Sequence, residues 1–226
     1  MKRLLLLLLV VGVCAGWSQR RTAPNTLTPE EQKEGFELLF DGKTLDKWDL
    51  RPGLEKSWKV VDGSIESASS AAGPTLLTKE DFANYVLRAE FRAHPEINSA
   101  LMLRQPRPRP QPEGGDPKAK GKKGGGAGYE LQIRDKDGDF PGGSFLTASI
   151  VNVQKAPGAK IVPGQWNTFE VTMNGEHMVV IYNGKKVVDA HDSRLKTGAV
   201  GLQSAHAEDP PGATIQFRNL KIKRLP

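Results

Sequence analysis

Two Asn-Gly pairs constrain the fold of this chain more than any other feature. Asn174-Gly175 separates the segment FEVTM from HMVVIY, and Asn183-Gly184 separates HMVVIY from KKVVDA. Asparagine and glycine both tolerate the positive φ that the two central residues of a type I′ turn require. The spacing therefore predicts a three-stranded antiparallel meander over residues 167–190, and Asp62-Gly63 predicts a third tight turn.

The rest of the chain continues this pattern of strands and turns. No segment has a sustained helical period, and alternating or β-branched segments predict strands throughout. Besides 167–173, 177–182 and 186–190, we expect strands at 36–40, 57–61, 64–67, 85–93, 99–104, 129–134, 148–153, 199–203 and 214–223. The last strand does not keep one phase of alternation, which predicts a bulge near Arg218. Many short strands favour an all-β sandwich or jelly roll.

The N-terminus has the composition of an export signal. Lys2 and Arg3 precede the apolar run 4–13, which is too short for a comfortable membrane span, and small residues follow it. We therefore expect residues 1–22 to be signal peptide and the start of a linker. The mature protein is then secreted or periplasmic, with no transmembrane segment. Cys14 offers a lipid anchor as the alternative, but Val13 before it fits a lipoprotein signal poorly.

One β domain is expected after a short lead-in. Residues 23–34 are predicted to be linker and one helical turn, with Thr28 as its cap and Pro29 at its first position. Residues 35–226 are long enough to bury a core of their own. Cys14 is the only cysteine, so no disulfide is expected in the mature domain. The oligomeric state stays open.

A Pro-, Lys- and Gly-rich insertion occupies residues 105–128. It has almost no apolar side chains to offset the entropy of ordering, so we expect a disordered surface loop there. A tether to anionic polymers is a weaker interpretation of this segment.

The formal net charge of +6 comes from residues 1–22 and 105–128, which carry +4 each and leave −2 for the rest. The domain itself therefore offers no basic groove for nucleic acid.

The segment GYELQIRD (128–135) is the strongest indication of a site. As a strand it places Tyr129, Leu131 and Ile133 on one face and Glu130, Gln132 and Arg134 on the other. A carboxylate, an amide and a guanidinium on one face can grip a polyhydroxylated ligand, although an ordinary solvated sheet face has the same pattern.

These segments together resemble the 3-keto-disaccharide hydrolase domain family. The matching pieces are, in order, GFELLFDGKTLDKW, WKVVDGSIE, LLTKEDFANYVLRAEFR, NSALMLR, GYELQIRD, PGQWNTFEVTMNGEHMVVIYNGKKVVD, GAVGLQSAH and FRNLKIKRL, between residues 35 and 225. The resemblance implies a concanavalin A-like jelly-roll sandwich of two antiparallel sheets. It also implies a carbohydrate as the substrate or ligand.

Two departures from the family pattern bear on the ligand. Asn98-Ser99-Ala100 stands where relatives have Asn-Ser-Gly, and GGSFLTAS (142–149) lacks the tyrosine of their Thr-Gly-x-Leu-Tyr segment. If that tyrosine stacks on sugar in relatives, this chain binds a different ligand or has lost activity.

The carboxylates on this face limit the chemistry. A conventional glycosidase needs two carboxyl groups, but Glu130 has no second carboxylate on its face of the strand, and Asp135 is one residue out of phase. A 3-keto sugar has an acidic C2 proton, so its glycosidic bond can leave by elimination and water can add back. That route needs one general base and a group that stabilises the enolate.

On this basis we expect Glu130 and His206 to be catalytic. The residues expected to bind the substrate are Arg104, Gln132, Asp135, Gln203 and Asn98. An exposed loop histidine and a surface ion pair are the plain alternatives for His206 and Arg104. No metal ligands are identified, although a divalent ion could stabilise the enolate, and His191 beside Asp189 or Asp192 is too generic a pattern to count.

The predicted function is a secreted hydrolase or lyase that cleaves 3-keto-glycosides or related disaccharides by base-assisted elimination and hydration. The alternative is a non-catalytic, lectin-like carbohydrate-binding module. A weaker third interpretation is an envelope scaffold that binds through the insertion.

Overall fold

The computed structural model describes residues 23–107, 128–136 and 145–226. The expected export signal, Cys14 and nearly all of the 105–128 insertion lie outside these ranges, as do residues 137–144. Within them, no helix is long and apolar enough to cross a membrane.

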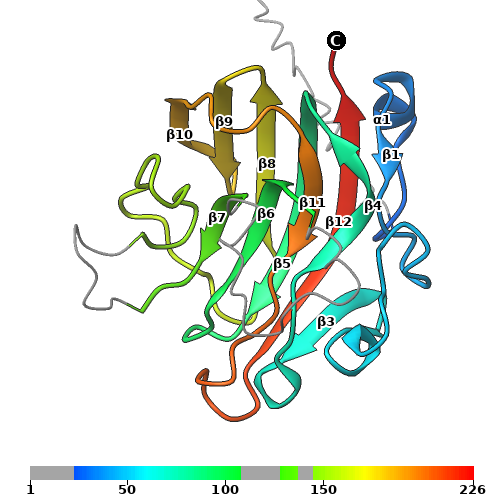
Figure 1. Cartoon of the computed structure of the whole chain (residues 1–226), viewed down its shortest axis with the longest axis vertical. Coiled ribbons are helices and arrows are strands. Elements are labelled where there is room, and N and C mark those ends of the chain that lie inside the picture. Colours follow the sequence, from blue (N-terminus) through cyan, green and yellow to red (C-terminus); the bar gives the residue numbers. More distant parts are fainter. Residues whose placement is uncertain (1–22, 108–127, 137–144) are drawn as a thin grey trace, which may run out of the picture.

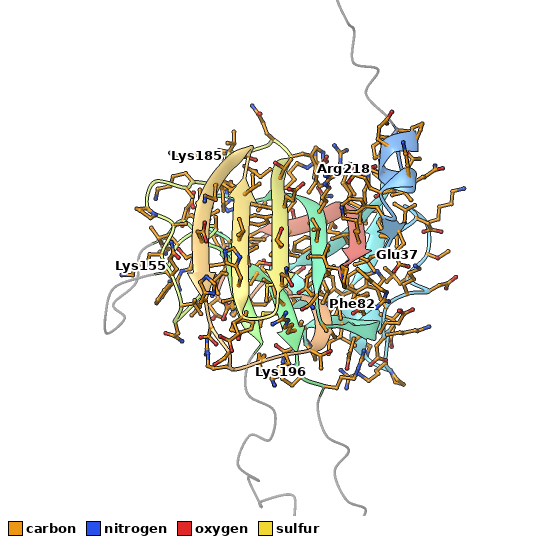
Figure 2. All side chains as sticks on the ribbon, turned by 90° about the horizontal axis from the view of Figure 1, so that it is seen from above. Glu37, Phe82, Lys155, Lys185, Lys196 and Arg218 are labelled. Carbon is orange, nitrogen blue, oxygen red and sulfur yellow. The ribbon has the colours of Figure 1, made fainter. Side chains whose placement is uncertain are left out.

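The larger sheet has eight strands within the described residues. They are β1 (Glu37–Leu38), β2 (Lys59–Val61), β3 (Ser64–Ala68), β5 (Tyr85–Ala93), β8 (Asn167–Asn174), β9 (His177–Tyr182), β10 (Lys185–His191) and β12 (Thr214–Arg224). Their order is β10-β9-β8-β5-β12-β3-β2, with β1 paired to β12, and neighbouring strands are antiparallel (Figure 1). Lys185 begins the edge strand β10 (Figure 2). It and the next residue, Lys186, are exposed, and charge at an edge discourages pairing with another chain.

The smaller sheet has four antiparallel strands in the order β4-β11-β6-β7. Their bounds are β4 Leu76–Phe82, β6 Ser99–Gln105, β7 Tyr129–Ile133 and β11 Gly198–Leu202. Strand β11 lies between strands that are distant from it in the sequence. The two sheets face each other (Figure 1), which confirms the predicted all-β sandwich of two antiparallel sheets.

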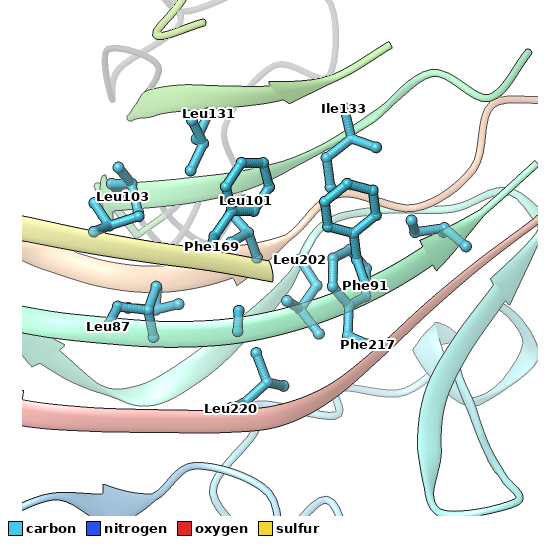
Figure 3. Packing of buried hydrophobic residues seen from close by; sticks show 14 of the residues in the cluster. Leu87, Phe91, Leu101, Leu103, Leu131, Ile133, Phe169, Leu202, Phe217 and Leu220 are labelled. Atoms are coloured by element: carbon cyan, nitrogen blue, oxygen red, sulfur yellow. The ribbon is translucent and has the colours of Figure 1, made fainter. Parts of the chain in front are cut away.

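The hydrophobic core fills the space between the sheets (Figure 3). Strand β5 alternates buried and half-buried residues along its whole length, so Leu87 and Phe91 point inward. Phe91 stacks on Phe169 of β8, with ring centroids 5.1 Å apart. Leu101 and Leu131 meet this layer from the smaller sheet, fully buried. Each such side chain contributes about 1.5–3 kcal/mol to the free energy of unfolding.

The predicted turns and bulge are largely confirmed. Asn183-Gly184 and Asp62-Gly63 both have positive φ at the two central positions of two-residue turns. The first hairpin differs by one residue: Asn174 pairs with His177, so the turn is Gly175-Glu176, with positive φ at the glycine alone. This is the pattern of a type II′ turn. The register of β12 shifts after Arg218, as expected.

The lead-in 23–34 is more ordered than a linker. Helix α1 (Pro29–Lys33) has the predicted Thr28 cap, completed by Glu31 as a capping box. Asn25 is 6% exposed and forms two hydrogen bonds with Asn219. The Asn25 backbone N–H donates to Asn219 Oδ1 at 2.6 Å, and the Asn219 backbone N–H donates to Asn25 Oδ1 at 2.9 Å. This segment is therefore held against the β12 bulge.

Two strand predictions are corrected. Residues 148–153 form turns rather than a strand, because Ala148 and Asn152 adopt positive φ. Strand β4 was not predicted, because the consecutive exposed residues Lys79, Glu80 and Asp81 hide any alternation. Short 3-10 helices occupy Leu54–Lys56 and Ser69–Ala71.

Candidate functional site

The outer face of the smaller sheet carries the candidate site. In β7, Tyr129, Leu131 and Ile133 are buried in the core, so Glu130 and Gln132 point to the opposite face. The register pairs Glu130 with Met102 and Gln132 with Ala100 of β6. The predicted alternation of GYELQIRD is therefore present.

Gln203 follows β11 and joins this group from the other side of β6. Its backbone N–H donates to Ala100 O at 2.9 Å, and Ser99 Oγ donates to its carbonyl at 2.8 Å. Its side-chain Nε2 lies 3.4 Å from Oε1 of Glu130 and donates to it. The small side chain of Ala100 thus lies between Gln132 of β7 and Gln203, which follows β11.

Glu130 is half-buried, and its surroundings change its acidity. Burial raises the pKa of Glu130 above its ordinary value, while the hydrogen bond from Gln203 and the positive charge of His206 lower it by a smaller amount. A carboxyl group whose pKa is raised toward neutral pH is a stronger base once ionised, and it can also hold a proton as an acid.

Met102 and Gly201 form an apolar floor beside Glu130. Met102 is 6% exposed and pairs with Glu130 on one side and Gly201 of β11 on the other. A Cβ on Gly201 would lie 2.8 Å from Thr75 Cγ2, 2.9 Å from Leu77 Cδ2 and 3.0 Å from Met102 Cβ. Only glycine leaves room for these side chains to pack over β11 beside Met102, which pairs with Glu130. Gly201 is not among the site residues predicted from the sequence, although a glycine inside a strand often marks a close approach of another group to the backbone.

Three amide oxygens on the outer face of the smaller sheet have no hydrogen-bond partner. They are Oε1 of Gln132, Oε1 of Gln203 and Oδ1 of Asn98, and all three atoms are buried. Asn98 precedes β6 and shares the outer face with Ala100 and Met102. A buried acceptor without a donor costs about 1–3 kcal/mol, and hydroxyl groups of a ligand would supply the missing donors.

His206 lies in the loop after β11. Its backbone N–H donates to Asp209 Oδ2 at 2.8 Å, and its Nδ1 is 3.2 Å from Glu208 Oε1. Its positive charge lowers the pKa of Glu130, and its loop is tied to the start of β6 because Asp209 accepts the backbone N–H groups of both His206 and Asn98. The structure therefore brings Glu130, Gln132, Gln203, Asn98 and His206 to one region.

Arg104 is not part of this region, which corrects its expected position. Positive φ at this residue breaks the alternation of β6, and the side chain is 1% exposed. The guanidinium donates to the backbone oxygens of Ala83 (2.8 Å), Gly175 (2.7 Å) and Leu195 (2.8 Å). Arg104 thus links three loops through their backbone oxygens. The predicted contact between Arg104 and Glu130 does not form.

Asp135 also has a different environment from the one expected. Its Oδ1 accepts from Thr147 Oγ1 at 2.7 Å, and its Oδ2 accepts from the Ile161 N–H at 2.8 Å. Both oxygens are engaged in fastening the segment after β7, so Asp135 supports the fold near the site rather than facing the amide oxygens.

Among the described residues, no three His, Cys, Asp or Glu side chains lie close enough together to hold a metal ion. His177 stacks on His191 and bonds Asp189 at 2.7 Å, but these groups lie on the exposed β9–β10 edge. The side chains of metal-ligand type in the candidate region are Glu130 and His206, with Glu208 and Asp209 beside His206.

Comparison with known proteins identifies relatives of this chain. A family model described as the 3-keto-alpha-glucoside-1,2-lyase-like domain matches residues 35–223. A crystal structure of a proposed glycosyl hydrolase from Parabacteroides distasonis is 22% identical, with a TM-score of 0.69, and the match covers 90% of this chain and 100% of that one. A second from the same organism is 24% identical, with a TM-score of 0.60 and coverage of 84% and 99%. These structures share the fold. No curated protein matches significantly.

Proposed function

The chain belongs to the family of 3-keto-alpha-glucoside-1,2-lyase-like domains, and from this premise we propose that it cleaves the glycosidic bond of 3-keto-glycosides. The export signal expected at residues 1–22 would place this reaction outside the cytoplasm. The proposed glycosyl hydrolases of Parabacteroides distasonis that share its fold are consistent with a carbohydrate substrate.

The observation that carries the proposal is the set of unpaired amide oxygens on the face of the smaller sheet that carries Glu130. Gln132, Gln203 and Asn98 each present a buried acceptor without a donor. A sugar has several hydroxyl donors on a compact frame, so it suits a face that presents several acceptors. Buried polar groups that stay unpaired in the free protein are tolerated where a ligand completes them.

Glu130 and His206 supply the acid–base chemistry in this proposal. The Glu130 carboxylate takes the C2 proton, and the electron pair of that bond forms the enolate of the C3 ketone. The enolate expels the glycosidic oxygen from C1 and leaves a C1=C2 double bond. His206 as imidazolium gives its proton to the departing oxygen. Addition of water, with OH on C1 and H on C2, completes net hydrolysis.

This route suits a site with one central carboxylate. Conventional glycosidases hold two carboxyl groups roughly 5–9.5 Å apart, one of them as nucleophile or base. Here the neighbours of Glu130 are amides, an imidazole and Met102, and Asp209 already accepts two backbone N–H groups. In this proposal the side-chain amide of Gln132 orients the substrate or its enolate. The reverse assignment, with His206 as base and Glu130 as acid, uses the same residues.

The rival function is a non-catalytic carbohydrate-binding module on the same face. The unpaired amides would bind a sugar without any proton transfer. In that case the hydrogen bond from Gln203 would fix the Glu130 carboxylate as an acceptor for sugar hydroxyl groups.

The test is release of free sugar from 3-keto-trehalose and a 3-keto-β-glucoside by the chain from residue 23 onward, with and without a chelator. The variant is Glu130→Gln. The matched control is Glu66→Gln, because Glu66 is also a half-buried strand glutamate that accepts from a glutamine, Gln216, at 2.7 Å, but on the other sheet. We expect release by wild type and by Glu66→Gln, and none by Glu130→Gln. Sugar binding without release by wild type would establish the rival.

A further inference from the structure

Asp209 holds together the two sides of the candidate site. Its side chain is 9% exposed. Oδ2 accepts the backbone N–H of His206 at 2.8 Å, and Oδ1 accepts the backbone N–H of Asn98 at 3.1 Å. Its own N–H donates to the His206 carbonyl at 3.1 Å. One carboxylate thus joins the loop that carries His206 to the start of β6.

His206 needs such a fastening because the sheet does not supply one. The ladder between β6 and β7 sets Glu130 and Gln132, and the pairing of β11 with β6 extends to Gln203. The strand itself ends at Leu202, so His206 lies beyond the regular ladder.

The rest of the loop has its own anchors. Ser204 Oγ donates to Gly73 O and accepts the Gly73 N–H, and Ser69 Oγ donates to Pro210 O at 3.0 Å. These bonds hold the loop on both sides of Asp209. Loss of the Asp209 contacts should therefore loosen the middle of the loop, where His206 lies, and leave its ends in place.

We propose that Asp209 is a positioning residue that sets His206 and Asn98 relative to Glu130. This inference rests on the proposed function for its meaning in catalysis. Both carboxylate oxygens of Asp209 are occupied by backbone donors, so Asp209 acts through its neighbours and does not touch the substrate. Charge-assisted bonds to backbone N–H groups are shorter and stronger than neutral ones, which suits a carboxylate to this task.

The test is a double-mutant cycle read by ¹³C NMR of the Glu130 side-chain carboxyl, without substrate. In the wild-type background, His206→Gln should raise the pKa of Glu130, because it removes a positive charge that lowers it. In the Asp209→Asn background, the same change should lose most of that effect, because the loop no longer holds His206 at a fixed position relative to Glu130. The cycle cancels the direct effect of the Asp209 charge on Glu130.

Two further variants separate position from charge and from folding. Asp209→Glu keeps the charge and both acceptor oxygens but moves them by the length of one CH₂ group. It should therefore also reduce the effect of His206→Gln on the pKa of Glu130. This variant replaces Asp209→Asn in the cycle if Asp209→Asn does not fold. Asp41→Asn is the matched control: Asp41 likewise accepts two backbone N–H groups, from Lys43 and Thr44, in the loop after β1. In the Asp41→Asn background, His206→Gln should change the pKa of Glu130 as much as it does in the wild type. An undiminished effect of His206→Gln on the pKa of Glu130 in both Asp209 variants would overturn the proposal.

Activity provides the second readout. If the wild type cleaves a 3-keto-glycoside, kcat/KM should fall by about 10²-fold in Asp209→Asn, the scale expected when a catalytic group is misplaced. Absence of cleavage by the wild type would contradict the proposed function, while the NMR cycle would still decide the role of Asp209.

Discussion

The side-chain amide of Gln203 donates to Oε1 of Glu130 across 3.4 Å, although Gln203 follows β11 and Glu130 lies in β7, two strands that do not pair with each other. Strand β6 lies between them and contributes only Ala100 and Met102 to the gap. The small Ala100 lets the two long side chains meet over β6. This contact orients the amide of Gln203, so that its unpaired oxygen is directed away from the carboxylate.

The acidity of Glu130 should appear in the pH dependence of stability. A carboxyl group whose pKa is raised by folding stabilises the folded state below its unfolded pKa and loses that contribution as pH rises through the folded pKa. Glu130→Gln should therefore have a larger free energy of unfolding than wild type at pH 7, and the two should converge below about pH 4. Urea unfolding at a series of pH values measures this, and a constant difference across the series would contradict it.

The unpaired oxygen of Gln132 should cost stability and aid binding. Gln132→Met removes a buried acceptor without a partner, so it should raise the free energy of unfolding by about 1 kcal/mol while weakening carbohydrate binding. Ser67→Ala is the control, because Ser67 Oγ is also buried and unpaired but belongs to β3 of the larger sheet. It should stabilise the protein with no change in affinity. Equal affinity of Gln132→Met and wild type, measured by calorimetry, would remove Gln132 from the site.

Arg104 should be a stability residue with no direct part in binding. Arg104→Met would leave the backbone oxygens of Ala83, Gly175 and Leu195 without their donor, at a cost on the order of 3 kcal/mol or more. Arg51→Met is the control, since Arg51 is exposed and pairs with the half-buried Asp49 at 3.4 Å, so its loss should cost under about 1 kcal/mol. Chemical denaturation compares the two variants, and equal midpoints would show that the buried guanidinium contributes little.

Gly201 should not tolerate a side chain. In Gly201→Ala the new Cβ would come within 3 Å of Thr75 and Leu77, so these side chains and Met102 must shift. Overpacking of this kind typically costs 1–3 kcal/mol. The loss should be smaller in the Leu77→Ala background, where the contact with Cδ2 is absent. A thermal melt of the four proteins in this cycle measures the coupling, and strict additivity would argue against the clash.

Much of the local structure could be predicted from sequence. The turn at Asn183-Gly184, the Thr28 cap and the alternation of Glu130 with Leu131 depend on backbone preferences of adjacent residues. The failures were also local in origin. Positive φ at Ala148 ended an apparent strand, and the charged run from Lys79 to Asp81 hid a real one.

The site divides in the same way. The sequence by itself determined that Glu130 and Gln132 share a polar face, because side-chain direction in a strand follows from its period of two. Only the tertiary structure decided which groups meet them. Insertion of β11 beside β6 brought Gln203 and His206 to Glu130, positive φ turned Arg104 into the interior, and Asp209 joined two distant segments. Pairing between strands far apart in sequence is set by the packing of the whole core, which no local pattern encodes.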